Sequence, residues 1–295
     1  MSAFRNCTEV SATCPVEATT YGYYPSLPAN SVLLTVFALI FCAQTILTFL
    51  TRVYSYSIVV AIGSLIELLG YAARIMMHHN PWDSSAKKMQ IVCLILAPSF
   101  LAAGIYLTVK HTVMHFGAQY SKLKPFLYTW IFIGSDAVSI LLQAVGGGIA
   151  SGADDDKKQL DLGNNIMIAG IVFQVVTMAI CGVLAIDYGL RRYRHRQFVS
   201  EVKRQSMPTS QKGRIFQAAI CFAYVTVMIR CIYRIPEMAG GWGNPRMRNE
   251  KEFLILDGLM IAFASIALTV FHPAFFFPVM RTGYGPPEGH ALSGL

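Results

Sequence analysis

Nine polar or charged side chains fall within apolar stretches of this 295-residue chain and a tenth lies just beyond one, and each could bind a ligand or carry a proton. The octet ELLGYAAR, residues 67–74, places a carboxylate, a phenol and a guanidinium on one helical face, because side chains three, four and seven residues apart lie together. The same spacing recurs at 136–143 and at 230–237. The candidate ligand-binding residues are Glu67, Tyr71, Arg74, Asp136, Gln143, Gln174, Arg230, Arg234, Glu237 and Asp257.

Charges within a membrane must be paired or hydrated, because one at the bilayer centre costs about 2.5–3.5 kcal/mol on insertion scales. The expected ion pairs are Glu67 with Arg230 or Arg234, and Arg74 with Asp257 or Glu237. One interpretation is that these groups are interhelical clamps, since membrane helices use polar side chains in packing. The clustering of the set at one depth, on several helices, instead favours a hydrated pocket in the outer half of the membrane.

The elements that position these residues are predicted to be membrane helices. Hydrophobic residues make up 54% of the chain and charged residues 14%, with a mean hydropathy of +0.48, whereas a soluble domain carries about 25% charged residues. A helix needs roughly 20 apolar residues to cross the hydrocarbon core, and lipid requires each span to satisfy its own backbone. Seven stretches have this length: 31–51, 56–76, 89–110, 126–148, 165–187, 214–235 and 253–276. We therefore expect an all-α integral membrane bundle of seven transmembrane helices.

The distribution of Lys and Arg between these spans predicts that the N-terminus is outside and the C-terminus cytosolic, because basic residues concentrate on the cytoplasmic side. Residues 1–30 then form an extracellular segment, 31–276 the transmembrane domain and 277–295 a cytosolic tail.

Two features of the first segment agree with this orientation. Asn6 begins an N-glycosylation tripeptide, which is modified only in lumenal or extracellular regions. Cys7 and Cys14 could form a disulfide in an oxidising compartment.

The net charge of +8 has a membrane explanation. The basic run RRYRHRQF, residues 191–198, directly follows the fifth span, where anionic lipid attracts Lys and Arg. We therefore expect no nucleic-acid partner. The loop at 188–213 is long enough to contact a cytosolic partner.

Six motifs in order along the chain resemble those of the fungal lipid-translocating exporter family, the RTA-like seven-helix proteins. They are Glu67, Gly70, Tyr71 and Arg74; Leu96, Ala97, Pro98, Ala102, Ala103 and Tyr106; Asp136, Gln143, Gly146 and Gly147; Gly170 and Gln174; Arg230, Tyr233, Arg234 and Glu237; and Glu250, Asp257, His272 and Pro273. The resemblance covers about residues 30–280. Leu254 and Ala274 stand where the family often has an aromatic residue and a glycine.

The resemblance implies a multi-pass protein of the plasma membrane or, as an alternative, of an endomembrane. Its relatives are associated with export or flipping of sphingoid long-chain bases, with resistance to amphiphilic toxic compounds and, in one branch, with porphyrin uptake. A long-chain base is a cationic amphiphile, so a cavity that offers Glu67, Asp136 or Asp257 suits its ammonium group. We expect no enzyme activity, no cofactor and no metal site, and the chain has no Walker-type nucleotide motif.

The predicted function is thus to bind and translocate or export amphiphilic, lipid-like molecules through an outward-side polar pocket. Two alternatives remain open. One is a seven-helix receptor or sensor for a lipophilic ligand. The other is a porphyrin- or haem-binding transporter that would use His272 or His111.

Overall fold

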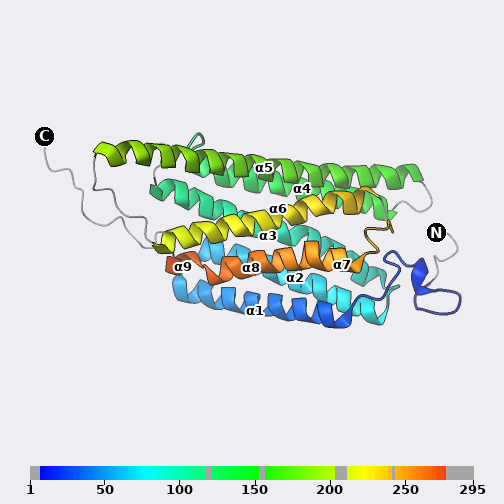
Figure 1. Cartoon of the computed structure of the whole chain (residues 1–295). Helices are drawn as coiled ribbons and strands as arrows, with labels where there is room; N and C mark the ends of the chain where they lie inside the picture. Colours follow the sequence, from blue (N-terminus) through cyan, green and yellow to red (C-terminus); the bar gives the residue numbers. More distant parts are fainter. Residues whose placement is uncertain (1–6, 117–120, 153–156, 203–210, 241–242, 277–295) are drawn as a thin grey trace.

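A computed structural model describes residues 7–116, 121–152, 157–202, 211–240 and 243–276, and within these ranges the regular structure is entirely helical (Figure 1). The elements are η2 (Val16–Ala18), α1 (Leu27–Thr51), α2 (Tyr54–His79), α3 (Ser84–Phe116), α4 (Pro125–Gly152), α5 (Lys157–Val202), α6 (Gln211–Ala239), α7 (Glu250–Phe253), the π-helical turn η4 (Leu254–Leu259), α8 (Met260–Val270) and α9 (Pro273–Phe276).

Seven helical stretches in this described part are long and apolar enough to cross a membrane, which confirms the predicted fold class. The seventh runs continuously through α7, η4 and α8, from Glu250 to Val270. The predicted seventh span reached residue 276, but the structure ends α8 six residues earlier and starts α9 at Pro273. Proline cannot supply the N–H that would continue the preceding helix.

The helices pack in chain order around a buried α3 (Figure 1). Each of the helices α1 to α5 contacts the next, α6 packs against α8, and α8 returns to α1. Because the connections are short, sequential helices are antiparallel neighbours. α3 also contacts α6 and α8, so polar side chains from α2, α6 and the seventh span can meet beside it.

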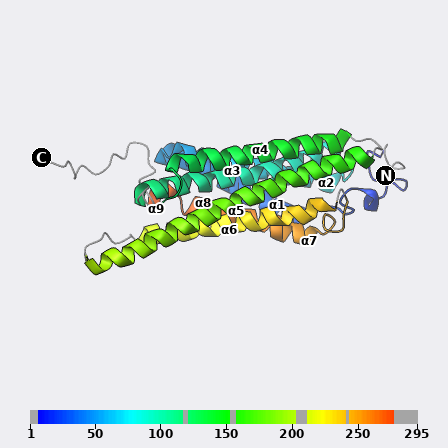
Figure 2. The same cartoon turned by 90° about the horizontal axis from the view of Figure 1, so that it is seen from above.

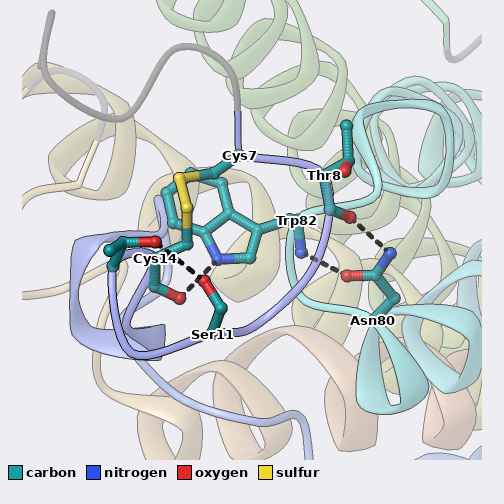
Figure 3. Close-up of a disulfide and its surroundings, with 7 residues drawn as sticks. Cys7, Thr8, Ser11, Cys14, Asn80 and Trp82 are labelled. Atoms are coloured by element: carbon teal, nitrogen blue, oxygen red, sulfur yellow. Dashed lines mark hydrogen bonds between the residues drawn. A yellow bond between two sulfur atoms is a disulfide. The ribbon is translucent and has the colours of Figure 1, made fainter.

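Residues 7–26 fold against one end of the bundle, which we call the N-terminal end (Figure 1). The predicted disulfide between Cys7 and Cys14 is present and closes a small loop (Figure 3). The turn between α2 and α3 holds this loop: the Trp82 indole N–H donates to the carbonyl of Cys14 at 3.3 Å. The Asn80 amide donates to the carbonyl of Thr8 at 2.8 Å.

Some predictions fall outside the described residues. They are glycosylation at Asn6 and the tail at 277–295. The predicted loop at 188–213 is wrong in its bounds, because α5 continues to Val202 and α6 begins at Gln211; the residues between them, 203–210, are not described.

Three glycines bring the backbones of α4 and α5 into contact. A Cβ atom at Gly146 would lie 2.6 Å from the carbonyl oxygen of Gly163, and one at Gly163 would lie 2.5 Å from the amide nitrogen of Ala150. A Cβ at Gly170 would lie 3.0 Å from the carbonyl oxygen of Ser139. Membrane helices gain van der Waals contact through such small residues, since lipid offers little hydrophobic drive for association.

This packing predicts different effects for two glycines of α4. Gly146→Ala should destabilise the bundle by about 1–3 kcal/mol, because the added methyl group overpacks the α4–α5 crossing. Gly134→Ala is the matched control, since a Cβ there meets no heavy atom within 4 Å. Thermal unfolding of the purified variants in detergent measures the difference, and equal melting temperatures would contradict the crossing described here.

Candidate functional site

Arg230 on α6 is the centre of the buried charge in the middle of the bundle. Its Nε lies 2.8 Å from Oδ1 of Asp257, and both side chains are almost fully buried. Its Nη2 donates to the carbonyl oxygen of Leu94 on α3. In an α-helix that carbonyl would accept a hydrogen bond from the N–H of residue 98, but Pro98 has no N–H. The guanidinium therefore donates to a carbonyl that the helix itself leaves unpaired.

Asp257 lies on a local irregularity of its own helix. The π-helical turn η4 spans Leu254–Leu259 between the α-helical segments α7 and α8. Such turns are rare and are often found at functional sites. Arg230 therefore joins two interrupted helices, α3 at its proline and the seventh span at its π turn.

Glu67 on α2 is buried beside this pair and has no direct partner. The residue is 1% exposed, and neither of its carboxylate oxygens accepts a hydrogen bond from any described residue. Asp257, Arg230 and Arg234 all interact with it electrostatically. The predicted ion pair of Glu67 with Arg230 or Arg234 is wrong, because Arg230 is held by Asp257, and Arg234 by Glu237.

The remaining charged pair of α6 is local. Arg234 Nη1 lies 2.7 Å from Oε2 of Glu237, one helical turn further on, and both residues are buried. Tyr71 on α2 completes this region: its ring stacks on Phe37, with centroids 5.6 Å apart. A Cβ at Gly258 would lie 2.9 Å from the Tyr71 hydroxyl, so that glycine lets the phenol approach the π turn.

Arg74 lies in a second charged group, nearer the N-terminal end. Its Nη2 lies 3.1 Å from Oε1 of Glu250, and its Nε donates to Oδ1 of Asn30 at 2.8 Å. Nη2 also lies 3.3 Å from the Tyr23 hydroxyl, and the guanidinium carbon is 4.2 Å from the centroid of the Phe253 ring. Burial raises the pKa of Tyr23, which stays a neutral phenol.

The predicted partners of Arg74, Asp257 or Glu237, are therefore wrong. Seven residues separate Glu67 from Arg74, and seven separate Glu250 from Asp257, which is about 10 Å along each helix. Because α2 and the seventh span are antiparallel, Arg74 meets Glu250 at one level while Glu67 lies near Asp257 at the next. The equal spacing was the signal in the sequence that could have identified Glu250.

Gln143 and Gln174 form a separate, uncharged cluster between α3, α4 and α5. Gln143 Nε2 donates to Ser139 Oγ at 2.8 Å and to Gln174 Oε1 at 3.3 Å. Gln174 Nε2 donates to Ser99 Oγ at 2.9 Å, and Ser139 Oγ donates to the carbonyl of Gly170 at 2.7 Å. These bonds join three helices to one another, which is the clamp interpretation of the predicted polar set.

Asp136 on α4 stands apart from the other candidates. It is 4% exposed, and neither carboxylate oxygen accepts a hydrogen bond that meets the geometric criteria from the described residues. The Tyr106 hydroxyl is the donor that acts on this carboxylate, in a cluster that also contains Phe132 and Cys181. Glu67 and Asp136 are thus two buried carboxylates of the described residues whose oxygens both lack an aligned donor, and they lie on the two sequence neighbours of α3.

The two histidines of the haem alternative form hydrogen bonds within the bundle. His272 Nε2 lies 2.8 Å from Ser57 Oγ, and its Nδ1 accepts from the backbone N–H of Ala274 at 3.2 Å. His111 Nδ1 lies 2.8 Å from the carbonyl oxygen of Leu107. Among the residues that the structure describes, no three His, Cys, Asp or Glu side chains are grouped to hold a metal ion.

Known proteins are similar in sequence to this chain along most of its length. The family model described as RTA1 like protein matches residues 60–280. The sphingoid long-chain base transporter RSB1 of Saccharomyces cerevisiae is 32% identical over 91% of this chain and 77% of its own length. Protoporphyrin uptake protein 1 and protein RTM1 of the same yeast are each 25% identical over 70% of the chain, covering 65% and 64% of their own lengths. No solved structure matches the chain.

The geometry around Arg230 predicts that a single variant is less stable than the corresponding double variant. Arg230→Met should destabilise the protein by about 3–5 kcal/mol, because it leaves the buried Asp257 carboxylate without its cation. Arg230→Met combined with Asp257→Leu should recover much of that loss, since no unpaired charge of the pair remains.

Thermal unfolding in detergent compares the two variants with the wild-type protein. A double variant that is no more stable than Arg230→Met would contradict the assignment of Asp257 as the partner of Arg230.

Proposed function

The chain belongs to the RTA1-like protein family, and from that premise we propose that it translocates cationic amphiphiles of the sphingoid long-chain base type through the region around Arg230. It is a multi-pass membrane protein with the seven-helix bundle described above. The name of its yeast relative RSB1 supports a lipid-like amphiphile as the substrate. We propose a transport role and no catalytic one.

Glu67 is the observation that carries this proposal. Its carboxylate is buried at the middle of α2 and accepts no hydrogen bond from the described part of the chain. A buried acidic group without a donor is costly, and such groups in membrane proteins mark substrate or ion pathways. The ammonium of a long-chain base would supply both a positive charge and N–H donors. When no ligand is bound, a proton would serve the same purpose, so Glu67 is also the residue we propose for proton coupling.

The neighbours of Glu67 suit a cation that must also leave. Arg230 and Asp257 form an ion pair, so their charges largely cancel, while Glu67 contributes an excess negative charge. Asp136, on the other side of α3, is a second carboxylate of the same kind. We propose that both contact the headgroup during translocation.

We propose that the N-terminal end faces outward and that the protein lies in the plasma membrane. The Cys7–Cys14 disulfide supports this orientation, because disulfides persist in oxidising compartments. The basic residues in the last part of α5, among them Arg191 and Arg192, lie at the opposite end, in agreement with the positive-inside rule. In this orientation, the Arg74–Glu250 pair lies on the outward side of Glu67 and would form part of the predicted outward pocket.

The test measures binding and leaflet distribution of a labelled sphingoid base in vesicles that contain the purified protein. Glu67→Gln removes the charge and keeps the shape, and we expect it to reduce the rate of movement at least about tenfold, since a hydrogen bond to a charged group contributes about 1.5–3 kcal/mol. Asp161→Asn is the matched control, because that carboxylate is exposed at the start of α5. An N-acetylated base, which carries no charge, should not be moved.

Three outcomes separate the hypotheses, provided that the variants keep the wild-type melting temperature. Loss of movement in Glu67→Gln alone supports the transport site. Binding of the base by the wild-type protein without movement favours the receptor or sensor alternative. A Glu67→Gln protein that moves the base at the wild-type rate would overturn the role proposed for this carboxylate.

A further inference from the structure

A cavity of about 330 Å³ lies near the end of the bundle opposite to the N-terminal end, between α3, α5 and α6. We propose that it binds an anionic phospholipid of the surrounding membrane, with an acyl chain in the cavity and the phosphate at Arg192. The site is separate from the carboxylates proposed to contact the transported amphiphile, and the inference does not depend on the transport function.

The cavity exists because α5 leaves its neighbour. α4 and α5 touch at the N-terminal end through Gly146 and Gly163, and Figure 2 shows α5 then running diagonally away from α4 with α6 beside it. Gly189 lines the cavity where α5 has diverged, and a Cβ atom at that position would meet no heavy atom within 4 Å. The glycine therefore widens a space that a larger side chain would fill without a clash.

The wall of the cavity suits an acyl chain. Most of its surface is apolar, and its volume is at the lower end of the range of about 300–1,000 Å³ for small-molecule sites. It is open to the membrane side through Gly189 and Cys221, both of which are exposed. The apolar lining comprises Val109, Val113, Ala185, Tyr188, Phe216, Ile220 and Cys221.

The rim supplies a cation and hydrogen-bonding side chains. Arg192 and Tyr193 from α5, Thr112 from α3 and Gln217 from α6 all line the cavity. A guanidinium binds phosphate through parallel N–H donors, and a tyrosine at the membrane interface lies with its ring in the apolar region and its hydroxyl toward water. These groups converge on one headgroup at the mouth of an apolar space.

The charge around the rim selects an anion. Asp187 lies five residues before Arg192, and its carboxylate is bonded to Arg191 at 3.0 Å and to Lys122 at 3.4 Å. Arg192 is the one charged residue among the described residues that line the cavity. A cationic long-chain base would be repelled here, which distinguishes this site from Glu67 and Asp136. In the proposed orientation, this end faces the cytosolic leaflet, which is rich in anionic lipid.

The experiment titrates the purified full-length protein in neutral detergent with phosphatidylserine and measures the melting temperature and the bound lipid by native mass spectrometry. Phosphatidylcholine, inorganic phosphate and a sphingoid base are titrated in parallel. We expect phosphatidylserine to bind and to raise the melting temperature, because the lipid bridges α3, α5 and α6, and the other three to have less than a tenth of its effect.

Two variants remove different halves of the site. Arg192→Gln removes the headgroup cation, and Gly189→Leu fills the acyl cavity; each should weaken phosphatidylserine binding at least tenfold. Arg194→Gln and Gly134→Leu are the matched controls, since Arg194 is exposed and does not line the cavity, and a side chain at Gly134 enters open space on α4. Both controls should bind the lipid as the wild-type protein does.

Several results would overturn the proposal. Equal binding of phosphatidylserine and phosphatidylcholine would remove the role of Arg192, and stabilisation by inorganic phosphate alone would remove the role of the cavity. Unchanged phosphatidylserine binding by Arg192→Gln would overturn the proposed site as a whole. If Gly189→Leu does not fold, Arg192→Gln still decides, because the Arg192 side chain is only partly buried and glutamine keeps a hydrogen-bonding group there.

Discussion

The ion pair of Arg230 with Asp257 is the interaction on which the centre of this bundle depends. Arg230 reaches Asp257 at a π-helical turn and the carbonyl of Leu94 in the turn before Pro98, so one guanidinium joins the irregular points of two helices. The bond to Leu94 satisfies a backbone carbonyl that Pro98 leaves without a donor, and unsatisfied backbone groups are costly in lipid. The same arrangement leaves Glu67 beside the pair, close enough to interact and without a bond of its own.

The polar side chains of the bundle serve two different purposes. Gln143 and Gln174 bond to their helical neighbours and clamp α3, α4 and α5, which is a structural role. Arg74 ties α2 to α1, to the start of the seventh span and to the N-terminal segment, and it closes the N-terminal end. The carboxylate oxygens of Glu67 and Asp136 have no such hydrogen bonds. This difference in hydrogen bonding separates the residues that could contact a ligand from those that hold the helices together.

The middle of the bundle and the cavity at its far end differ in the charged side chains that they offer to a ligand. Glu67 and Asp136 are buried carboxylates near the middle, whereas the cavity is lined by Arg192. A cationic amphiphile and an anionic lipid would therefore occupy different places on one protein. The close glycine crossing of α4 and α5 at one end is what allows α5 to diverge at the other.

The sequence alone determined the seven-helix class, the approximate spans and the buried polar residues, because apolar length and helical spacing are local properties. It suggested the Cys7–Cys14 disulfide, which the structure contains. It did not determine the ion pairs: Arg74 and Glu67 were each expected to bond to residues that the fold gives to others. Helical spacing shows which residues share a face, but rotation and register between helices decide which faces meet. Only the tertiary structure supplies that register. Here it shows in three features: the carbonyl that Pro98 leaves without a donor, the π turn at Asp257, and the equal seven-residue spacing of charged residues on two antiparallel helices.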